Sequence, residues 1–270
     1  MCELLAMSCR QPARLTSSLT ALASRAQGDS RNRDGWGLAF YQGRDVALYR
    51  DTGPADTSAL VPWLEANGPA TTLSIGYIRH STRGAIDLAN TGPFIRELGG
   101  QMQVFAHNGN LKSLTQSSLG QSGPFQPVGE TDSELAFCLL LERVSQLSHA
   151  PRQPACLEAT MNAVAEMALS LREYGPATFL YANGDMLFIH ADRRLQRLTG
   201  EVTAPALYQL ECPAGDKPAL VHDDDFSDAQ MTQRLILFAT VPLTDEAWKP
   251  MPRGAVTAVR RGEIAATMQL

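Results

Sequence analysis

The sequence has 270 residues, a formal net charge of −5 and 44% hydrophobic residues, which are ordinary values for a folded globular protein. They exclude collagen-like, mucin-like and wholly disordered chains. The acidic balance gives no electrostatic reason to expect nucleic acid or an anionic membrane as a partner. A chain of this length can bury a full core, and we expect a single domain over residues 1–270.

The predicted elements are mostly short strands. Runs rich in β-branched and aromatic residues, bounded by Gly, Pro, Asn or Asp, predict strands at 37–41, 46–50, 72–78, 102–106, 177–182, 186–190, 235–240 and 255–260. Apolar residues at helical spacing predict helices over 15–26, 133–147 and 156–171. Asn183-Gly184 is the strongest hairpin signal, because a type I′ turn needs two positive φ angles. The strands cluster without βαβ alternation, which favours a mostly antiparallel α+β fold.

The cysteines and the apolar runs indicate where the protein resides. Five cysteines at irregular spacing, with no Cys-x-x-Cys pair, argue against a disulfide framework or a structural zinc site. The longest apolar run, 135–141, is far shorter than the roughly 20 residues that span a bilayer. The N-terminus has no basic segment before an apolar stretch, so no signal peptide is expected. We therefore expect a cytoplasmic protein without a membrane partner.

Cys2 is the first residue that could carry chemistry. Removal of Met1 is permitted when the second residue is small, and the mature chain would then begin with a thiol and a free α-amine on one residue. A thiol of pKa about 8.5 beside an amine of pKa about 8 is a nucleophile with a matched general base. No histidine or buried carboxylate is then required. The alternative is chance, since most cysteines are inert.

Two later segments each allow a structural and a chemical interpretation. Arg79 follows a predicted strand and could present its planar fork to a substrate carboxylate, although the spacing alone favours a surface Arg whose stem covers the sheet edge. Asn108-Gly109 also follows a strand, where the pair usually forms a turn. The same pair could supply an oxyanion hole from the Asn108 amide and the Gly109 N–H.

The segment from Thr131 to Glu134 opens a predicted helix. Thr131-x-x-Glu134 is a capping box, and Asp132 lies in the first turn, where the helix dipole favours an anion. That account leaves open whether the Asp132 carboxylate also holds a cationic substrate amine.

The remaining polar residues suggest no metal site. The histidines are dispersed, with no pair at helical ligand spacing, and lie at His80, His107, His149, His190 and His222. The acidic run 223–225 is best interpreted as a solvated loop within the linker-like stretch 213–227. No serine lies in a Gly-x-Ser-x-Gly elbow.

Taken together and in order, the motifs resemble one enzyme family. They run Cys2, Asp34-Gly-Trp-Gly, Arg79-x-x-Thr82-x-Gly84, Asn90-Thr-Gly-Pro-Phe94, His107-Asn-Gly109 and Thr131-Asp-Ser-Glu134. This series resembles the class II, or N-terminal nucleophile, glutamine amidotransferases, and most of all their stand-alone branch. The resemblance continues into the second half, through the hairpin 179–189 and the segment 239–244.

The resemblance implies a four-layer αββα sandwich with the nucleophile at the start of a central strand. It also implies that Cys2 attacks the side-chain amide while its own amine moves the proton. Asn108 and Gly109 would stabilise the tetrahedral oxyanion. No metal and no organic cofactor would be needed.

The resemblance also implies which residues bind the substrate. Arg79 and Thr82 would hold the α-carboxylate of the glutamyl group, and Asp132 its α-amine. Two departures bear on substrate identity. The family often has His where this chain has Gly92, which could enlarge the site, and often His or Gln where this chain has Arg83, which adds a cation near the substrate.

We therefore expect a cysteine amidohydrolase acting on glutamine or a γ-glutamyl amide through a thioester on Cys2. No residues remain for an ammonia-consuming synthase domain, so either a partner protein receives the ammonia or the amide is simply hydrolysed. The alternatives are hydrolysis of a γ-glutamyl thiol metabolite or peptide and, from a different class, a catalytically silent regulatory subunit. Retention of Met1 would favour the last.

Overall fold

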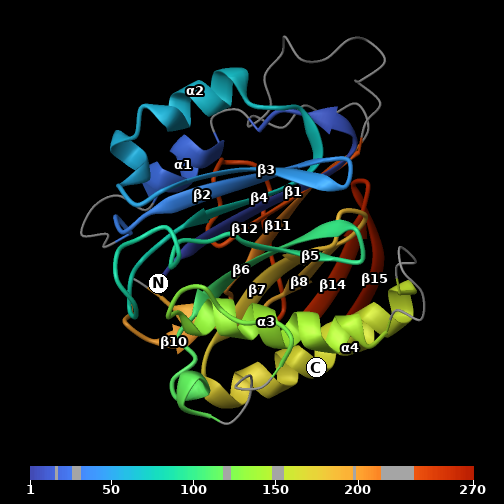
Figure 1. Ribbon diagram of the computed structural model, residues 1–270. Coiled ribbons are helices and arrows are strands. Elements are labelled where there is room, and N and C mark those ends of the chain that lie inside the picture. Colours follow the sequence, from blue (N-terminus) through green and yellow to red (C-terminus); the bar gives the residue numbers. More distant parts are fainter. Residues whose placement is uncertain (16–17, 26–31, 118–122, 148–154, 197–198, 214–233) are drawn as a thin grey trace.

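The computed structural model describes residues 1–15, 18–25, 32–117, 123–147, 155–196, 199–213 and 234–270. Nearly all of the expected loop 213–227, with His222 and the acidic run 223–225, lies outside these residues, as does His149. Two sheets stack face to face, with helices covering the outer face of each (Figure 1). The helices are α1 (Ser18–Arg25), α2 (Leu60–Asn67), α3 (Asp132–Ser145) and α4 (Leu157–Tyr174).

The first sheet has seven strands and carries the N-terminal strand at its centre. Its order is β13 (Lys249–Pro250), β11 (Tyr208–Cys212), β12 (Leu235–Ala239), β1 (Glu3–Ala13), β4 (Thr71–Ile78), β2 (Trp36–Gln42) and β3 (Asp45–Asp51). Every neighbouring pair is antiparallel. The helices α1 and α2 cover its outer face (Figure 1).

The second sheet has six strands and is also antiparallel throughout. Its order is β15 (Glu263–Gln269), β14 (Ala255–Arg260), β8 (Leu187–His190), β7 (Ala177–Ala182), β6 (Gln101–Gly109) and β5 (Phe94–Leu98). The helices α3 and α4 cover its outer face (Figure 1). A separate two-stranded ribbon joins β9 (Arg194–Leu195) to β10 (Val202–Thr203), and two short 3-10 turns are η1 (Ala55–Thr57) and η2 (Leu114–Gln116).

Three apolar clusters hold these four layers together, and β1 contributes to two of them. Leu4 and Ala6 face the second sheet, while Leu5 and Met7 face α1 and α2. Both faces of the strand are therefore buried, which leaves no polar–apolar alternation in its sequence. The expected α+β, four-layer αββα sandwich, with Cys2 at the start of a central strand, is confirmed.

The predicted helices and the hairpin are present with small differences. The hairpin between β7 and β8 forms at the expected place, but the turn is not of type I′. Gly184 has a positive φ of 90°, whereas Asn183 does not and instead accepts hydrogen bonds at Oδ1 from the N–H groups of Asp185 (3.2 Å) and Met186 (2.9 Å). The Asn side chain thus mimics part of the turn, which leaves only one position that requires glycine.

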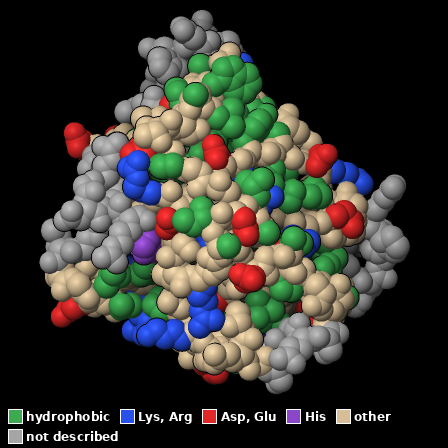
Figure 2. All heavy atoms as spheres, turned by 60° about the vertical axis from the view of Figure 1, so that its left-hand side comes forward, with side chains coloured by type: hydrophobic (Ala, Val, Ile, Leu, Met, Phe, Trp, Pro, Cys, Tyr) green, Lys and Arg blue, Asp and Glu red, His purple; other side chains and the backbone are tan. Residues whose placement is uncertain are grey.

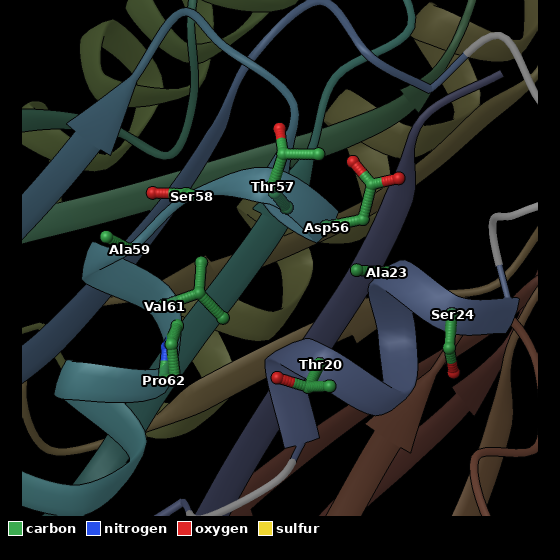
Figure 3. Close-up of a pocket in the computed structure, with 10 residues that line it drawn as sticks. Thr20, Ala23, Ser24, Asp56, Thr57, Ser58, Ala59, Val61 and Pro62 are labelled. Atoms are coloured by element: carbon green, nitrogen blue, oxygen red, sulfur yellow. The ribbon is translucent and has the colours of Figure 1, made fainter.

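The outer surface shows no single dominant charge in the view of Figure 2. Acidic and basic side chains are interspersed there, and hydrophobic side chains gather toward the top. In the part of the chain that the structure describes, no helix is both long enough and apolar enough to cross a bilayer. A hollow of about 330 Å³ lies between α1 and the segment from η1 into α2 (Figure 3). It belongs to the outer helical layer, and Asp56 at its wall is paired with Arg33 at 2.9 Å.

Candidate active site

The thiol of Cys2 lies between the two sheets, immediately before β1. Its side chain is 8% exposed, and Sγ lies 3.0 Å from the phenol oxygen of Tyr77 and 3.4 Å from the backbone nitrogen of His80. Burial raises the pKa of the thiol, while the His80 N–H, the Tyr77 hydroxyl and the N-terminal charge lower it. Burial therefore destabilises the thiolate, and the neighbouring hydrogen-bond donors partly offset this effect.

Strand pairing explains why these residues meet. Glu3 of β1 is opposite Ile78 of β4 in an antiparallel register, so the residue before Glu3 lies beside the residues after Ile78. The pairing of β1 with β4 therefore places the segment that begins at Arg79 next to Cys2. Tyr77 points into the space between the sheets, with Cys2 in the same apolar cluster.

Arg79 is only 2% exposed, and its guanidinium organises the loop that follows it. Its terminal nitrogens donate to loop acceptors, namely the carbonyl oxygens of Asp34 (3.4 Å), Arg83 (3.0 Å), Gly84 (3.5 Å) and Ala85 (3.0 Å) and the hydroxyl of Ser81 (3.3 Å). Thr82 lies exposed on the same loop. Arg79 thereby fixes the backbone that carries Thr82.

Asp34 ties this loop to the start of β2. Its Oδ2 accepts a hydrogen bond from the N–H of Ser81 at 2.7 Å and lies 3.7 Å from Nδ1 of His80. Backbone hydrogen bonds between Asp34 and Arg79, and from Arg79 to Gly35, add to the same connection. Asp34 belongs to one of the motifs that carry the family resemblance, and its role becomes visible only in the structure.

Asn108 and Gly109 end β6, in the second sheet. Asn108 is fully buried, and within the described residues neither Nδ2 nor Oδ1 of its amide has a hydrogen-bond partner. A buried amide without partners is costly, and it is the kind of group that a bound ligand would satisfy. A Cβ on Gly109 would lie 1.9 Å from the carbonyl oxygen of Pro176 and 2.4 Å from Nε2 of His107, so only glycine fits.

His107, next to Asn108, links the end of β6 to neighbouring elements. Its Nε2 lies 3.2 Å from the carbonyl oxygen of Pro176, and its Nδ1 lies 2.9 Å from Oγ of Ser133. A carbonyl can only accept, so Nε2 carries the proton and the Ser133 hydroxyl donates to Nδ1. Burial lowers the pKa of His107, which agrees with a neutral ring. His107 is therefore a structural link between β6 and α3.

Asp132 occupies the first turn of α3 and is 4% exposed. The expected cap is present, because the Thr131 hydroxyl accepts from the Glu134 N–H at 3.2 Å. The other half of the capping box differs. The Glu134 carboxylate accepts from the N–H of Gly129 at 2.7 Å and pairs with Arg96 at 2.5 Å.

Asn90 joins the two sides of the site. Its Nδ2 donates to the carbonyl oxygen of Ala85 at 3.2 Å, the same oxygen that accepts from Arg79. Its Oδ1 accepts from the N–H of Glu130 at 2.7 Å, two residues before Asp132. One buried amide thus connects the Arg79 loop to the start of α3, a role that the sequence analysis did not assign.

The two departures from the family pattern have identifiable surroundings. A Cβ on Gly92 would lie 3.3 to 3.5 Å from ring carbons of Tyr77, so the space in that direction is occupied by the Tyr77 ring. Arg83 donates from Nη1 to the hydroxyl of Thr115 at 2.7 Å. The Arg83 side chain therefore anchors the loop to η2.

A buried ion pair supports the start of β1. The Glu3 carboxylate lies 2.8 Å from Nη2 of Arg194 and accepts a very short hydrogen bond from the Thr240 hydroxyl. Nη1 of Arg194 donates to the carbonyl oxygen of Thr240 at 2.6 Å. No local signal in the sequence pointed to this network, because its members are distant along the chain.

Similar proteins identify the family of this chain. The model of the family described as "Glutamine amidotransferases class-II" matches residues 1–270. The chain belongs to this family. It is 34% identical to "Putative glutamine amidotransferase YafJ" of Escherichia coli, over 94% of this chain and 95% of that protein. It is 32% identical to a "Putative glutamine amidotransferase" of Haemophilus influenzae, over 97% of this chain and 85% of that protein.

Two solved structures are similar to this chain over nearly its whole length. A predicted glutamine amidotransferase from Pseudomonas aeruginosa has a TM-score of 0.70 and 31% identity, over 98% of this chain and 99% of that one. The glutamine phosphoribosylpyrophosphate amidotransferase of Bacillus subtilis has a TM-score of 0.60 at 15% identity, over 99% of this chain and 49% of that one. The latter likeness shows the fold alone.

Membership in the class II family indicates an enzyme that acts on the side-chain amide of glutamine, by hydrolysis or transfer. The structure brings Cys2 against Tyr77, whose phenol in turn lies near the charges of Arg79 and Asp132. Asn108 and Gly109 come from the second sheet, and Asp132 holds the loop that follows them through Leu111. Thr82 is exposed on the loop that follows Arg79.

Proposed function

We propose that the whole chain, after removal of Met1, acts as one amidotransferase unit that hydrolyses the side-chain amide of glutamine or a γ-glutamyl compound through a thioester on Cys2. The observation that carries the proposal is the buried Sγ of Cys2 beside two hydrogen-bond donors, together with the unpartnered amide of Asn108 at the end of the facing sheet. Free α-amine on Cys2 would be the general base, so no further base is required.

The reaction divides into two steps on one carbon atom. The Cys2 thiol proton moves to the α-amine, and sulfur bonds to the amide carbon. The carbonyl oxygen becomes an oxyanion that Nδ2 of Asn108 and the N–H of Gly109 stabilise. The α-ammonium protonates the departing nitrogen, the C–N bond breaks, and a thioester remains. Water, deprotonated by the same amine, then attacks the thioester and releases the acid and the thiol.

The glutamyl head group would be held by opposite charges on the two sides of the site. The terminal nitrogens of Arg79 already donate within the protein, so Arg79 would act on the α-carboxylate through its positive charge, and Thr82 through its exposed hydroxyl. The anionic Asp132 is suited to an α-amine. Free glutamine and γ-glutamyl amides share this head group. Ammonia release from glutamine and amine release from a panel of γ-glutamyl amides, thiol conjugates and peptides would separate the two substrate classes.

Covalent labelling tests the nucleophile. A diazo-ketone analogue of glutamine should add one adduct at Cys2, and Cys2→Ala and Cys2→Ser should both lose hydrolysis while melting normally. Cys156→Ala is the matched control, because Cys156 is an exposed thiol. Labelling at Cys9, Cys138, Cys156 or Cys212 in place of Cys2 would refute the proposal.

Intact-mass measurement of the purified chain tests the general base. Loss of Met1 is expected, since an amide nitrogen on Cys2 cannot accept the proton. Retention of Met1 in a chain without hydrolase activity would support the silent regulatory subunit instead.

A separate measurement tests the fate of the ammonia. In an active protein, ammonia trapped in solution during turnover would indicate simple hydrolysis. Ammonia that appears only in the product of an added protein would indicate a partner.

A further inference from the structure

The hydroxyl of Tyr77 lies beside the Cys2 sulfur but has no role in the reaction proposed above. Its oxygen lies 3.0 Å from Sγ of Cys2, and both side chains are buried in the cluster between the sheets. Tyr77 belongs to β4, the direct neighbour of β1, so the contact is set by two paired central strands. The hydroxyl is therefore held at the reacting sulfur by two central strands of the first sheet.

The direction of this hydrogen bond follows from the chemistry of the two groups. Burial raises the pKa of Tyr77 well above its ordinary value, so the phenol keeps its proton at neutral pH. A thiolate has no proton to give. Once Cys2 is ionised, the phenol must donate and the sulfur must accept. The backbone N–H of His80, at 3.4 Å, is a second donor to the same sulfur.

The glycine at position 92 is part of the same arrangement. Its backbone packs against the Tyr77 ring, and a Cβ there would lie 3.3 Å from a ring carbon. Because Gly92 has no side chain, the Tyr77 ring can occupy this space. The ring and its hydroxyl are thus placed by packing as well as by the hydrogen bond.

We propose that Tyr77 is a catalytic residue, whose phenol donates a hydrogen bond to the Cys2 sulfur and stabilises the thiolate. This inference rests on the proposed function. When the thiol proton moves to the α-amine, the phenol offsets part of the desolvation of the new negative charge. When water cleaves the thioester, the thiolate leaves toward the same donor. The phenol keeps its own proton in both steps.

Among the described residues, the charges that act on this pair come from defined elements. The N-terminal amine and Glu3 act on the thiol from its own strand. Arg79, just after β4, and Asp132, at the start of α3, act on the phenol. These charges are unchanged when the phenol hydroxyl alone is removed, so a single-atom substitution isolates the hydrogen bond.

Tyr77→Phe, with Tyr181→Phe as the matched control, tests the role. Tyr181 is also fully buried, and its hydroxyl makes one hydrogen bond, to Oε1 of Gln103 at 2.7 Å, away from the thiol. The measurement is the rate of alkylation of Cys2 by iodoacetamide against pH, read by mass spectrometry of the N-terminal peptide. Tyr77→Phe should move the pH midpoint up by about 1 to 2 and slow alkylation at neutral pH by roughly 10- to 100-fold. Tyr181→Phe should leave both unchanged.

The outcomes separate this inference from the proposed function. Alkylation needs no substrate, so a failure of glutamine hydrolysis does not affect the reading. An unchanged midpoint in Tyr77→Phe would refute the catalytic role, even if glutamine is hydrolysed at Cys2. If Tyr77→Phe does not fold, replacement of tyrosine by 3-fluorotyrosine supplies a more acidic donor of nearly the same shape. The midpoint of Cys2 should then fall, and an unchanged midpoint would again overturn the inference.

Discussion

The carboxylate of Asp132 accepts a hydrogen bond from the backbone N–H of Leu111 at 2.6 Å, and this joins the first turn of α3 to the loop that follows Gly109. The other carboxylate oxygen accepts from the N–H of Ser133 at 3.0 Å. The same negative charge therefore positions the proposed oxyanion hole and lies where the substrate α-amine is expected. Under the proposed function, Asp132 both positions this loop and binds the α-amine, so a substitution should affect both stability and kinetics.

Asp132→Asn should raise KM for glutamine strongly and also lower the melting temperature. The new amide NH₂ would face a backbone N–H in place of an acceptor, which costs about 1 to 3 kcal/mol of unfolding free energy. Kinetics with glutamine and with an analogue lacking the α-amine distinguish the two effects. A binding role predicts a much smaller loss for the analogue, and equal losses for both substrates would leave Asp132 as a loop anchor only.

Asn108→Ala should lower activity without lowering stability. Removing one oxyanion-hole donor should lower kcat by about 10²- to 10³-fold with little change in KM. Since neither amide atom of Asn108 has a partner, the variant should melt at the same temperature or higher. Asn90→Ala is the contrast, because the Asn90 amide is fully engaged and its loss should lower the melting temperature. A normal kcat in Asn108→Ala would leave Asn108-Gly109 with a structural role only, at the end of β6.

Gly109→Ala should destabilise the fold severely, because the added methyl group would overlap the carbonyl oxygen of Pro176. Gly43→Ala is the matched control. Gly43 has a φ of 66° with nothing within 4 Å of a Cβ, so it should lose only the roughly 1 to 2 kcal/mol of left-handed strain. Urea unfolding of both variants provides the comparison, and similar losses would show that β6 can shift to accommodate the methyl group.

His190 should make the fold sensitive to mild acid. Burial lowers its pKa to about 4, and its Nδ1 donates to the carbonyl oxygen of Ala177 at 2.7 Å. Between about pH 6.5 and pH 4 the unfolded chain binds a proton there that the folded chain does not. Stability is therefore fully present above pH 6.5 and falls as the pH drops toward 4, by up to about 3 kcal/mol.

The measurement is the free energy of unfolding in urea between pH 7 and pH 4.5. His190→Gln keeps a donor for Ala177 but does not titrate, so its stability should depend less on pH than that of the parent protein. A residual slope is expected from His107, whose pKa burial also lowers. Parallel curves for the two proteins would contradict the assignment to His190.

Much of the fold was predictable from local pattern alone. Strands such as β2 and β7 and helices such as α3 were expected within a few residues of their bounds, because β-branched runs and apolar periodicity act over short distances. Strands with unusual surroundings were not found by pattern. β1 is buried on both faces, and β15 is an edge strand with mostly exposed residues, so neither shows clean alternation. The place of β1 came only from the family resemblance.

By itself, the sequence determined the nucleophile candidate at Cys2, the order of the motifs and the cap of α3 by Thr131, because each depends on residues that are close along the chain. Only the tertiary structure decided that Tyr77 touches Cys2 and that Asn90 joins the Arg79 loop to Glu130. These contacts cross 75 and 40 residues and depend on strand register and on packing between the sheets. A polar side chain acquires such a role from its three-dimensional neighbours, and a linear pattern cannot specify those neighbours.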